Sequence, residues 1–153
     1  IAGAVSPMVG QNLGARLVHR ARKSAQVGNW LAIFVMIGIG FPFLFFPEFF
    51  VSIFTQDQAV IRIANVYLRY LSPTFGFIAM SLVLGRAMTG SGDTLSPMAI
   101  TLVSQCGIGL MLVIVLSHTI NIIGIWLGIA LSNVVQGILM WIRYKRSEWE
   151  TEQ

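Results

Sequence analysis

The sequence from Gly10 to Lys23 reads GQNLGARLVHRARK and lies between two strongly apolar segments. It combines a polar turn with four cationic side chains, those of Arg16, Arg20, Arg22 and Lys23. Loops that carry Lys and Arg next to a hydrophobic span are retained in the cytoplasm. We therefore expect this loop on the cytoplasmic side, and its location fixes the direction of every later crossing.

The composition is that of a helical membrane protein. Of the 153 residues, 56% are hydrophobic and only 10% are charged, whereas a soluble domain carries roughly 25% charged residues. The mean hydropathy is +0.77, and the apolar runs approach the ~20 residues that a helix needs to cross the hydrocarbon. Transmembrane barrels, with strands of about 10 alternating residues, do not fit this pattern. The sequence predicts an all-α membrane protein.

The positive charge follows the apolar segments. Eight of the ten basic residues lie in three segments next to those spans, namely 16–23, Arg86 and 143–146. This distribution is typical of membrane topology, so we do not expect nucleic acid as a partner. The single cysteine, Cys106, excludes an intrachain disulfide and fits a small packing residue. Residues with the spacing of a metal site or a phosphate-binding loop are absent, so we expect no enzyme, no catalytic residue, no metal and no cofactor.

The apolar pattern predicts four complete spans preceded by the end of another. The sequence begins at Ile1 within an apolar segment, which we interpret as part of a longer chain. We expect a polar turn at Gln11-Asn12 and a separate interfacial helix at 15–25. The predicted segments are the end of a preceding span at 1–9, spans at about 27–46, 58–88, 97–116 and 122–142, and a cytoplasmic tail at 143–153.

Local signals refine these boundaries. Asp57 is a predicted N-cap for the second span, and Ser96 before Pro97 is a predicted N-cap for the third. Pro73 and Gly76 predict a kink within the second span. The third and fourth spans are expected to be joined by a short outer loop over 117–121.

Uncharged polar residues are concentrated in the last two spans. Thr101, Gln105 and Gly109 have helical i, i+4, i+8 spacing, and Ser104 lies beside them. The fourth span adds Ser132, Asn133 and Gln136. Such side chains hydrogen-bond between helices as packing contacts, which is the more common role, or line a polar cavity. The second span offers aromatic and methionine side chains with the same two interpretations. The candidate cavity residues are Tyr70, Thr74, Phe77, Thr101 and Gln105.

Carboxylates are nearly absent from the predicted spans. Between Ala59 and Ser147 the only acid is Asp93, in a predicted cytoplasmic turn. Ion-coupled transport usually requires a titratable group at membrane depth. If the protein is a coupled transporter, we expect that group outside these residues.

Three motifs resemble the multidrug and toxic compound extrusion (MATE) family, in particular its C-terminal part. GQNLGAR at 10–16, followed by Arg20-Ala21, looks like the cytoplasmic loop after that family's eighth span. FTQD at 54–57 with YLR at 67–69 resembles the outer loop and the start of the tenth span, and AMTGSGDT at 87–94 resembles the turn before the eleventh. The residues of the cytoplasmic family motif are Gly10, Gln11, Gly14, Ala15, Gly90, Gly92 and Asp93.

This resemblance implies a twelve-helix transporter of two lobes, of which these residues would form the C-terminal part of the second. It implies an antiporter that exports organic cations, drugs or metabolites in exchange for Na⁺ or H⁺ by alternating access. The tenth span here lacks the coupling carboxylate of some branches, so the coupling ion is expected to bind outside this segment. The alternatives are a lipid-linked saccharide flippase of the same superfamily and a membrane scaffold that transports nothing.

The expected partners are the lipid bilayer, a small amphipathic or cationic substrate and the remaining helices of the same transporter. We expect an integral, multi-pass plasma membrane protein of prokaryotic origin. Its cytoplasmic segments are predicted at 10–26, 86–96 and 143–153.

Overall fold

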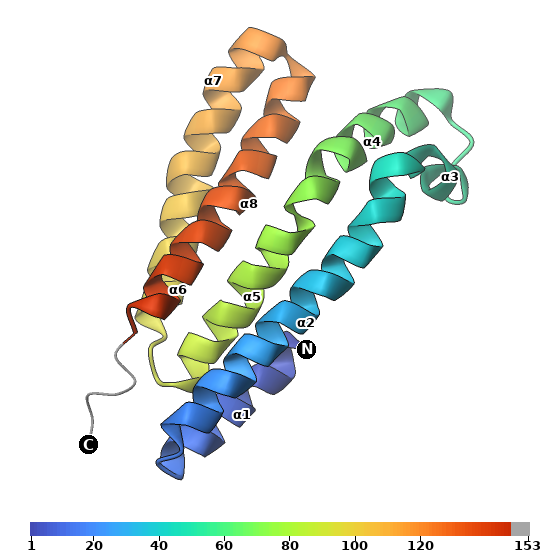
Figure 1. Ribbon diagram of the computed structural model, residues 1–153. Coiled ribbons are helices and arrows are strands. Elements are labelled where there is room, and N and C mark those ends of the chain that lie inside the picture. Colours follow the sequence, from blue (N-terminus) through green and yellow to red (C-terminus); the bar gives the residue numbers. More distant parts are fainter. Residues whose placement is uncertain (148–153) are drawn as a thin grey trace.

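The structure is a computed structural model that describes residues 1–147, and all the regular elements in this range are helical (Figure 1). Two short segments depart from α-helical geometry, one with the tighter 3₁₀ turn (η1) and one with the wider π turn (η2). The elements are α1 (Ala2–Gly14), α2 (Val18–Phe45), α3 (Pro47–Ser52), α4 (Gln58–Leu71), η1 (Ser72–Thr74), α5 (Phe75–Gly90), α6 (Leu95–Thr101), η2 (Leu102–Gly109), α7 (Leu110–Ile120) and α8 (Ile122–Lys145).

Four continuous helical segments are long and apolar enough to cross a membrane, as the sequence predicts. They are Val18–Phe45, Gln58–Gly90, Leu95–Ile120 and Ile122–Lys145. Large apolar side chains remain exposed on them, including Phe34 at 71% and Met111 at 72%, as lipid contact requires. The α1–α2 turn, the α5–α6 loop and the end of α8 lie at the same end of the bundle (Figure 1). The three basic segments, all predicted to be cytoplasmic, are therefore found at one end.

The first turn lies later than predicted. Helix α1 continues through Pro7 and past the Gln11-Asn12 position, because the Asn12 side-chain amide donates to its own helix at the Met8 carbonyl (2.7 Å). The chain reverses at Arg16, whose φ is 57°. The Arg16 N–H bonds to the Leu13 carbonyl and the Leu17 N–H to the Asn12 carbonyl, which is the Schellman pattern that terminates helices. The separate interfacial helix at 15–25 was also wrong, because α2 is continuous from Val18.

The second span begins and bends as predicted. Asp57 caps α4, since its Oδ1 accepts from the Ala59 N–H at 2.8 Å. The kink is the 3₁₀ turn η1, which contains Pro73. Hydroxyl groups bond to carbonyls there: Ser72 Oγ donates to Leu68, and Thr74 Oγ1 donates to Leu71 at 2.8 Å. Both bonds lie within one turn of Pro73, which has no N–H of its own to donate.

The third span differs from the prediction at both ends. It begins at Leu95, and its N-cap is Thr94 rather than Ser96, while Oδ1 of the preceding residue, Asp93, accepts the Ser96 N–H at 3.0 Å. The predicted outer loop over 117–121 was wrong, since α7 extends to Ile120 and Asn121 alone, at φ 56°, reverses the chain. A Cβ on Gly124 would lie 2.1 Å from the Leu116 carbonyl oxygen. This close approach allows the tight α7–α8 hairpin.

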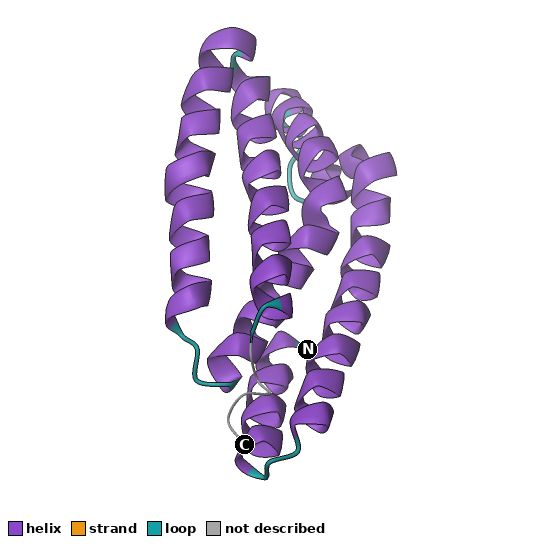
Figure 2. Cartoon of the chain, turned by 60° about the vertical axis from the view of Figure 1, so that its left-hand side comes forward, coloured by secondary structure: helices purple, strands orange, loops and turns teal. Residues whose placement is uncertain are grey.

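Helix α5 occupies the centre of the bundle and packs against α1, α2 and α8 (Figures 1 and 2). Its buried side chains Ala79, Val83 and Ala87 form a core with Val5 and Val9 of α1, joined by alanines of α2. On its other side, Leu84 and Met88 contact Met140 of α8. The α6–η2–α7 segment packs mainly on α8, so α8 connects it to the central helix.

Candidate functional site

An uncharged polar cluster joins η2 to α8 at membrane depth. Gln105 is at its centre: its Nε2 donates to Asn133 Oδ1 at 3.0 Å and to Gln136 Oε1 at 2.8 Å. Its Oε1 accepts from Ser132 Oγ at 3.2 Å. Gln136 Nε2 in turn donates to Thr101 Oγ1 at 3.0 Å. We call these five residues the amide cluster.

The backbone beneath the cluster is a π-helical segment, which the sequence did not predict. A π turn inside an α-helix is uncommon and is frequently found at functional sites. It includes Ser104, which is fully buried and whose Oγ lacks a hydrogen-bond partner among the described residues. A Cβ on Gly109 would lie 3.2 Å from Ser132 Cβ. The small residue therefore brings η2 close to α8, which places Gln105 within reach of three side chains.

A groove of about 700 Å³ runs beside the amide cluster, between α5 and the α6–η2 segment. Thr101, Gln105 and Gln136 contribute the polar wall, whereas Leu82, Met98 and Met140 are among its apolar residues. Arg86 and Thr89 line its end near the α5–α6 loop. The groove thus combines hydrogen-bonding amides with flexible thioethers, as ligand sites do.

The candidate residues predicted on the second span lie elsewhere. Thr74 is buried and its hydroxyl bonds to its own helix. Phe77 packs on α8, where a Cβ on Gly137 would lie 2.9 Å from Phe77 Cβ. Tyr70 is half-buried. The structure therefore brings Thr101 and Gln105 together in the groove and leaves Tyr70, Thr74 and Phe77 outside its lining.

Asn133 and Gln136, which bond to Gln105, were not among the predicted cavity residues. The sequence identified them as intramembrane polar groups, and Gln136 lies three residues after Asn133 and four after Ser132, which is the spacing of neighbours on a helix. The sequence did not show that these side chains bond to Gln105, because Gln105 and Gln136 are 31 residues apart in sequence.

Two motif glycines meet where α1 crosses α5. A Cβ on Gly10 would lie 3.0 Å from the Gly90 carbonyl oxygen, and one on Gly90 would lie 2.3 Å from the Ser6 carbonyl oxygen. Gly92 has a φ of 96°, which favours glycine in the α5–α6 loop. Gln11, Gly14 and Ala15 are exposed, and a Cβ on Gly14 would meet no atom within 4 Å. The motif residues Gly10, Gly90 and Gly92 have clear steric roles.

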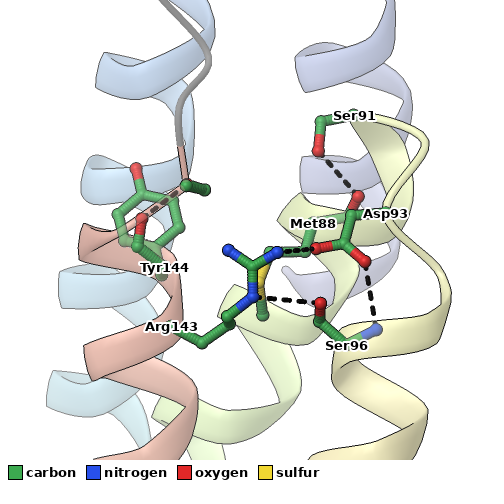
Figure 3. Close-up of polar contacts among 7 residues, drawn as sticks. Met88, Ser91, Asp93, Ser96, Arg143 and Tyr144 are labelled. Atoms are coloured by element: carbon green, nitrogen blue, oxygen red, sulfur yellow. Dashed lines mark hydrogen bonds and ion pairs between the residues drawn. The ribbon is translucent and has the colours of Figure 1, made fainter.

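The motif acid Asp93 forms an ion pair that links the α5–α6 loop to α8 (Figure 3). Arg143 Nη2 donates to Asp93 Oδ2 at 2.8 Å, and Arg143 Nε donates to Ser96 Oγ at 3.0 Å. Burial raises the pKa of Asp93, but hydrogen bonds from Ser96 and the Arg143 guanidinium outweigh it and hold that pKa below its ordinary value. Asp93 is therefore ionised at neutral pH and serves as a structural link. Within residues 1–147, His, Cys, Asp and Glu side chains form no group of three or more that could hold a metal ion.

Comparison with known proteins gives consistent results. The chain is 24% identical to the probable multidrug resistance protein NorM of Thermotoga maritima, over 98% of this chain and 33% of the relative. It is 32% identical to the multidrug resistance protein PmpM of Pseudomonas aeruginosa, over 94% of this chain and 31% of the relative. The chain spans about a third of the length of these curated relatives.

The fold is also that of a solved transporter. A crystal structure of a mutant of the Vibrio cholerae MATE transporter VcmN matches with a TM-score of 0.91 and 17% identity, over 99% of this chain and 34% of that chain. Together with the four apolar helices, this likeness shows the fold of a multi-pass membrane protein. The MatE family model matches residues 1–115. The chain belongs to the MatE family of membrane transporters.

Proposed function

We propose that the full protein is a secondary active antiporter, not an enzyme, which exports organic cations, drugs or metabolites in exchange for Na⁺ or H⁺. Membership of the MatE family supports this proposal, as do the names of the relatives NorM and PmpM, both given as multidrug resistance proteins. The observation within this chain that supports it most is the amide cluster beside a groove of about 700 Å³.

The groove suits an amphipathic substrate of variable shape. Thr101, Gln105 and Gln136 offer hydrogen-bond donors and acceptors without a fixed charge. Met98 and Met140 are long and unbranched, so they adapt to different apolar groups. In this proposal Tyr70, Thr74 and Phe77 support the kinked second span, and alternating access moves α5 relative to substrate.

The coupling ion is proposed to bind to the other two thirds of the transporter. Between Ala59 and Ser147 the sequence contains a single carboxylate, Asp93. That group is paired with Arg143 at the basic end of the bundle, so it is not available at membrane depth. Glu48 lies in the first turn of the short helix α3 and Asp57 caps α4, so neither is inside a span. We therefore expect the carboxylate for Na⁺ or H⁺ coupling on the remaining helices.

The test is efflux by the full-length gene in a host that lacks its own efflux pumps. Ethidium accumulation is measured with and without a Na⁺ or H⁺ gradient across the membrane. The proposal predicts lower accumulation when the gradient is present, and accumulation that is unchanged by expression would contradict it.

A pair of variants tests the groove itself. Gln105→Leu removes the centre of the amide cluster, whereas Gln58→Leu makes the same change at an exposed position at the start of α4. We expect Gln105→Leu to change the relative efflux of different substrates and Gln58→Leu to leave it unchanged. An equal loss for every substrate in Gln105→Leu would show that the cluster serves packing alone.

A further inference from the structure

A second groove, of about 650 Å³, lies between α1 and α2, and none of its lining residues belongs to the helices of the amide cluster. We call it the α1–α2 groove. It has an apolar part and a polar end, because the two helices run antiparallel from the turn at Arg16. Its lining residues are Ile1, Ala4, Val5, Met8, Asn12, Arg20, Lys23, Ser24, Val27, Gly28 and Leu31.

The apolar part is formed where the helices approach closely. A Cβ on Gly28 would lie 2.5 Å from Val5 Cγ2, so these two residues define the floor. Met8, Val27 and Leu31 stand along the sides and remain 48%, 58% and 53% exposed. Exposed apolar walls around a continuous groove at membrane depth are suited to a hydrocarbon chain.

The polar end is cationic, and the residues that line the groove include no acid. Arg20 and Lys23 are both exposed there, with Asn12 and Ser24 beside them. Residues 1–45, which include all of α1 and α2, contain no Asp or Glu. The ion pair between Arg143 and Asp93 lies outside this groove, and neither of its residues lines it. The two cations therefore have unused capacity to bind an anion.

The length of the groove matches one leaflet. Arg20 and Leu31 are separated by eleven residues of one helix, which is ~16 Å at 1.5 Å per residue. Half of the hydrocarbon core of a bilayer is ~15 Å. A molecule with its polar group at Arg20 and its apolar chain extending to Leu31 would thus occupy one leaflet.

We propose that the α1–α2 groove binds an anionic phospholipid of the leaflet at the basic end of the bundle. The lipid phosphate lies between Arg20 and Lys23, and one acyl chain follows the groove over Gly28. A free phosphate would leave the apolar part empty. A second apolar helix packed in the groove would bury Arg20 and Lys23 without an acid to pair with them, which is unfavourable. Basic pockets between membrane helices bind anionic headgroups by the same chemistry.

The experiment measures lipid binding by native mass spectrometry of the purified full-length transporter. Phosphatidylglycerol is the anionic probe, phosphatidylcholine is the zwitterionic control and inorganic phosphate is the soluble anion control. We expect phosphatidylglycerol to bind in preference to phosphatidylcholine and to resist competition by millimolar phosphate. Equal binding of both lipids, or full displacement by phosphate alone, would overturn the proposal.

Variants at both ends of the groove make the test specific. Each cation near the surface contributes about 1 kcal/mol, so Arg20→Gln with Lys23→Gln should weaken phosphatidylglycerol binding about 30-fold at 1.4 kcal/mol per tenfold. The matched control is Arg146→Gln, an exposed cation at the same end of the bundle that does not line the groove. Equal affinity in the double variant and the control would refute the headgroup contact.

The apolar end has its own variant, Ala4→Phe, which fills the groove and leaves both cations in place. We expect it to reduce phosphatidylglycerol binding as well. Undiminished binding would show that the acyl chain lies elsewhere and would overturn the proposal. Because binding is measured without transport, the result does not depend on whether the protein is an antiporter.

Discussion

Replacement of Gly90 by Ala tests the crossing of α1 and α5, where two family motifs meet. The new Cβ would lie 2.3 Å from the Ser6 carbonyl oxygen and 3.0 Å from two further Ser6 backbone atoms. Because the Ser6 atoms belong to the backbone, they cannot rotate away as a side chain could. Helices α1 and α5 must therefore separate until the new Cβ and the Ser6 carbonyl oxygen reach the 3.4 Å of ordinary contact. Overpacking of this kind costs about 1 to 3 kcal/mol. We expect a clearly lower midpoint of thermal unfolding for the purified full-length transporter.

Gly38→Ala is the matched control, because it is the same substitution within α2 at a position where a Cβ would meet nothing within 4 Å. Alanine favours a helix by up to ~1 kcal/mol over glycine, so this variant should be as stable as the parent or more so. If Gly90→Ala unfolds at or above the temperature of the parent, the close approach of Ser6 and Gly90 does not exist and the steric explanation of the motif is refuted.

Three further predictions follow from other parts of the structure. In a double-mutant cycle, Asp93→Asn and Arg143→Gln should show a coupling free energy of about 0.5 to 1 kcal/mol, since these side chains are 26% and 40% exposed; additive effects would exclude the ion pair. The pKa of Asp93 is depressed in the folded state, so the stability that its ionised carboxylate adds to the fold is complete above the ordinary aspartate pKa and is lost as the pH falls through the depressed pKa. The midpoint of thermal unfolding of Asp93→Asn should therefore depend less on pH in this acid range than that of the parent. An equal dependence would contradict the depressed pKa of Asp93. In a cysteine-free background, single cysteines at Ser24 and Gln58 should react with impermeant reagents from opposite sides of the membrane, and labelling from one side only would refute the topology.

The helices could be predicted from the sequence because hydropathy and charge report on lipid and water directly. The kink at Pro73 and the cap at Asp57 were predicted because each depends on local backbone chemistry. The turn after α1 was placed too early because the polar Asn12 resembled a loop residue, whereas its side chain bonds to the Met8 carbonyl within the helix. Polar side chains at helix ends are ambiguous in this way, since helix and turn satisfy them equally well.

The site was only partly predictable because it depends on contacts between segments distant in sequence. Spacing identified Gln105 and Thr101, but not that Gln105 bonds to Asn133 and Gln136 of α8. The π turn over η2 has no local signal comparable to a proline. Tyr70 and Phe77 on the kinked span were predicted to line the cavity because they are aromatic, yet Phe77 packs over Gly137. Which face of a helix lines the groove is decided by tertiary packing, and the sequence of that helix alone does not show it.

The central claim is that the full protein couples export of an organic substrate to an ion gradient. The most direct measurement uses the purified full-length transporter in lipid vesicles, with a Na⁺ or an H⁺ gradient imposed and ethidium movement recorded by fluorescence. We expect ethidium to move against its own gradient in exchange for one of the two ions, and this movement to stop when the ion gradient is dissipated. Ethidium movement that neither gradient drives, in vesicles that contain folded protein, would contradict it.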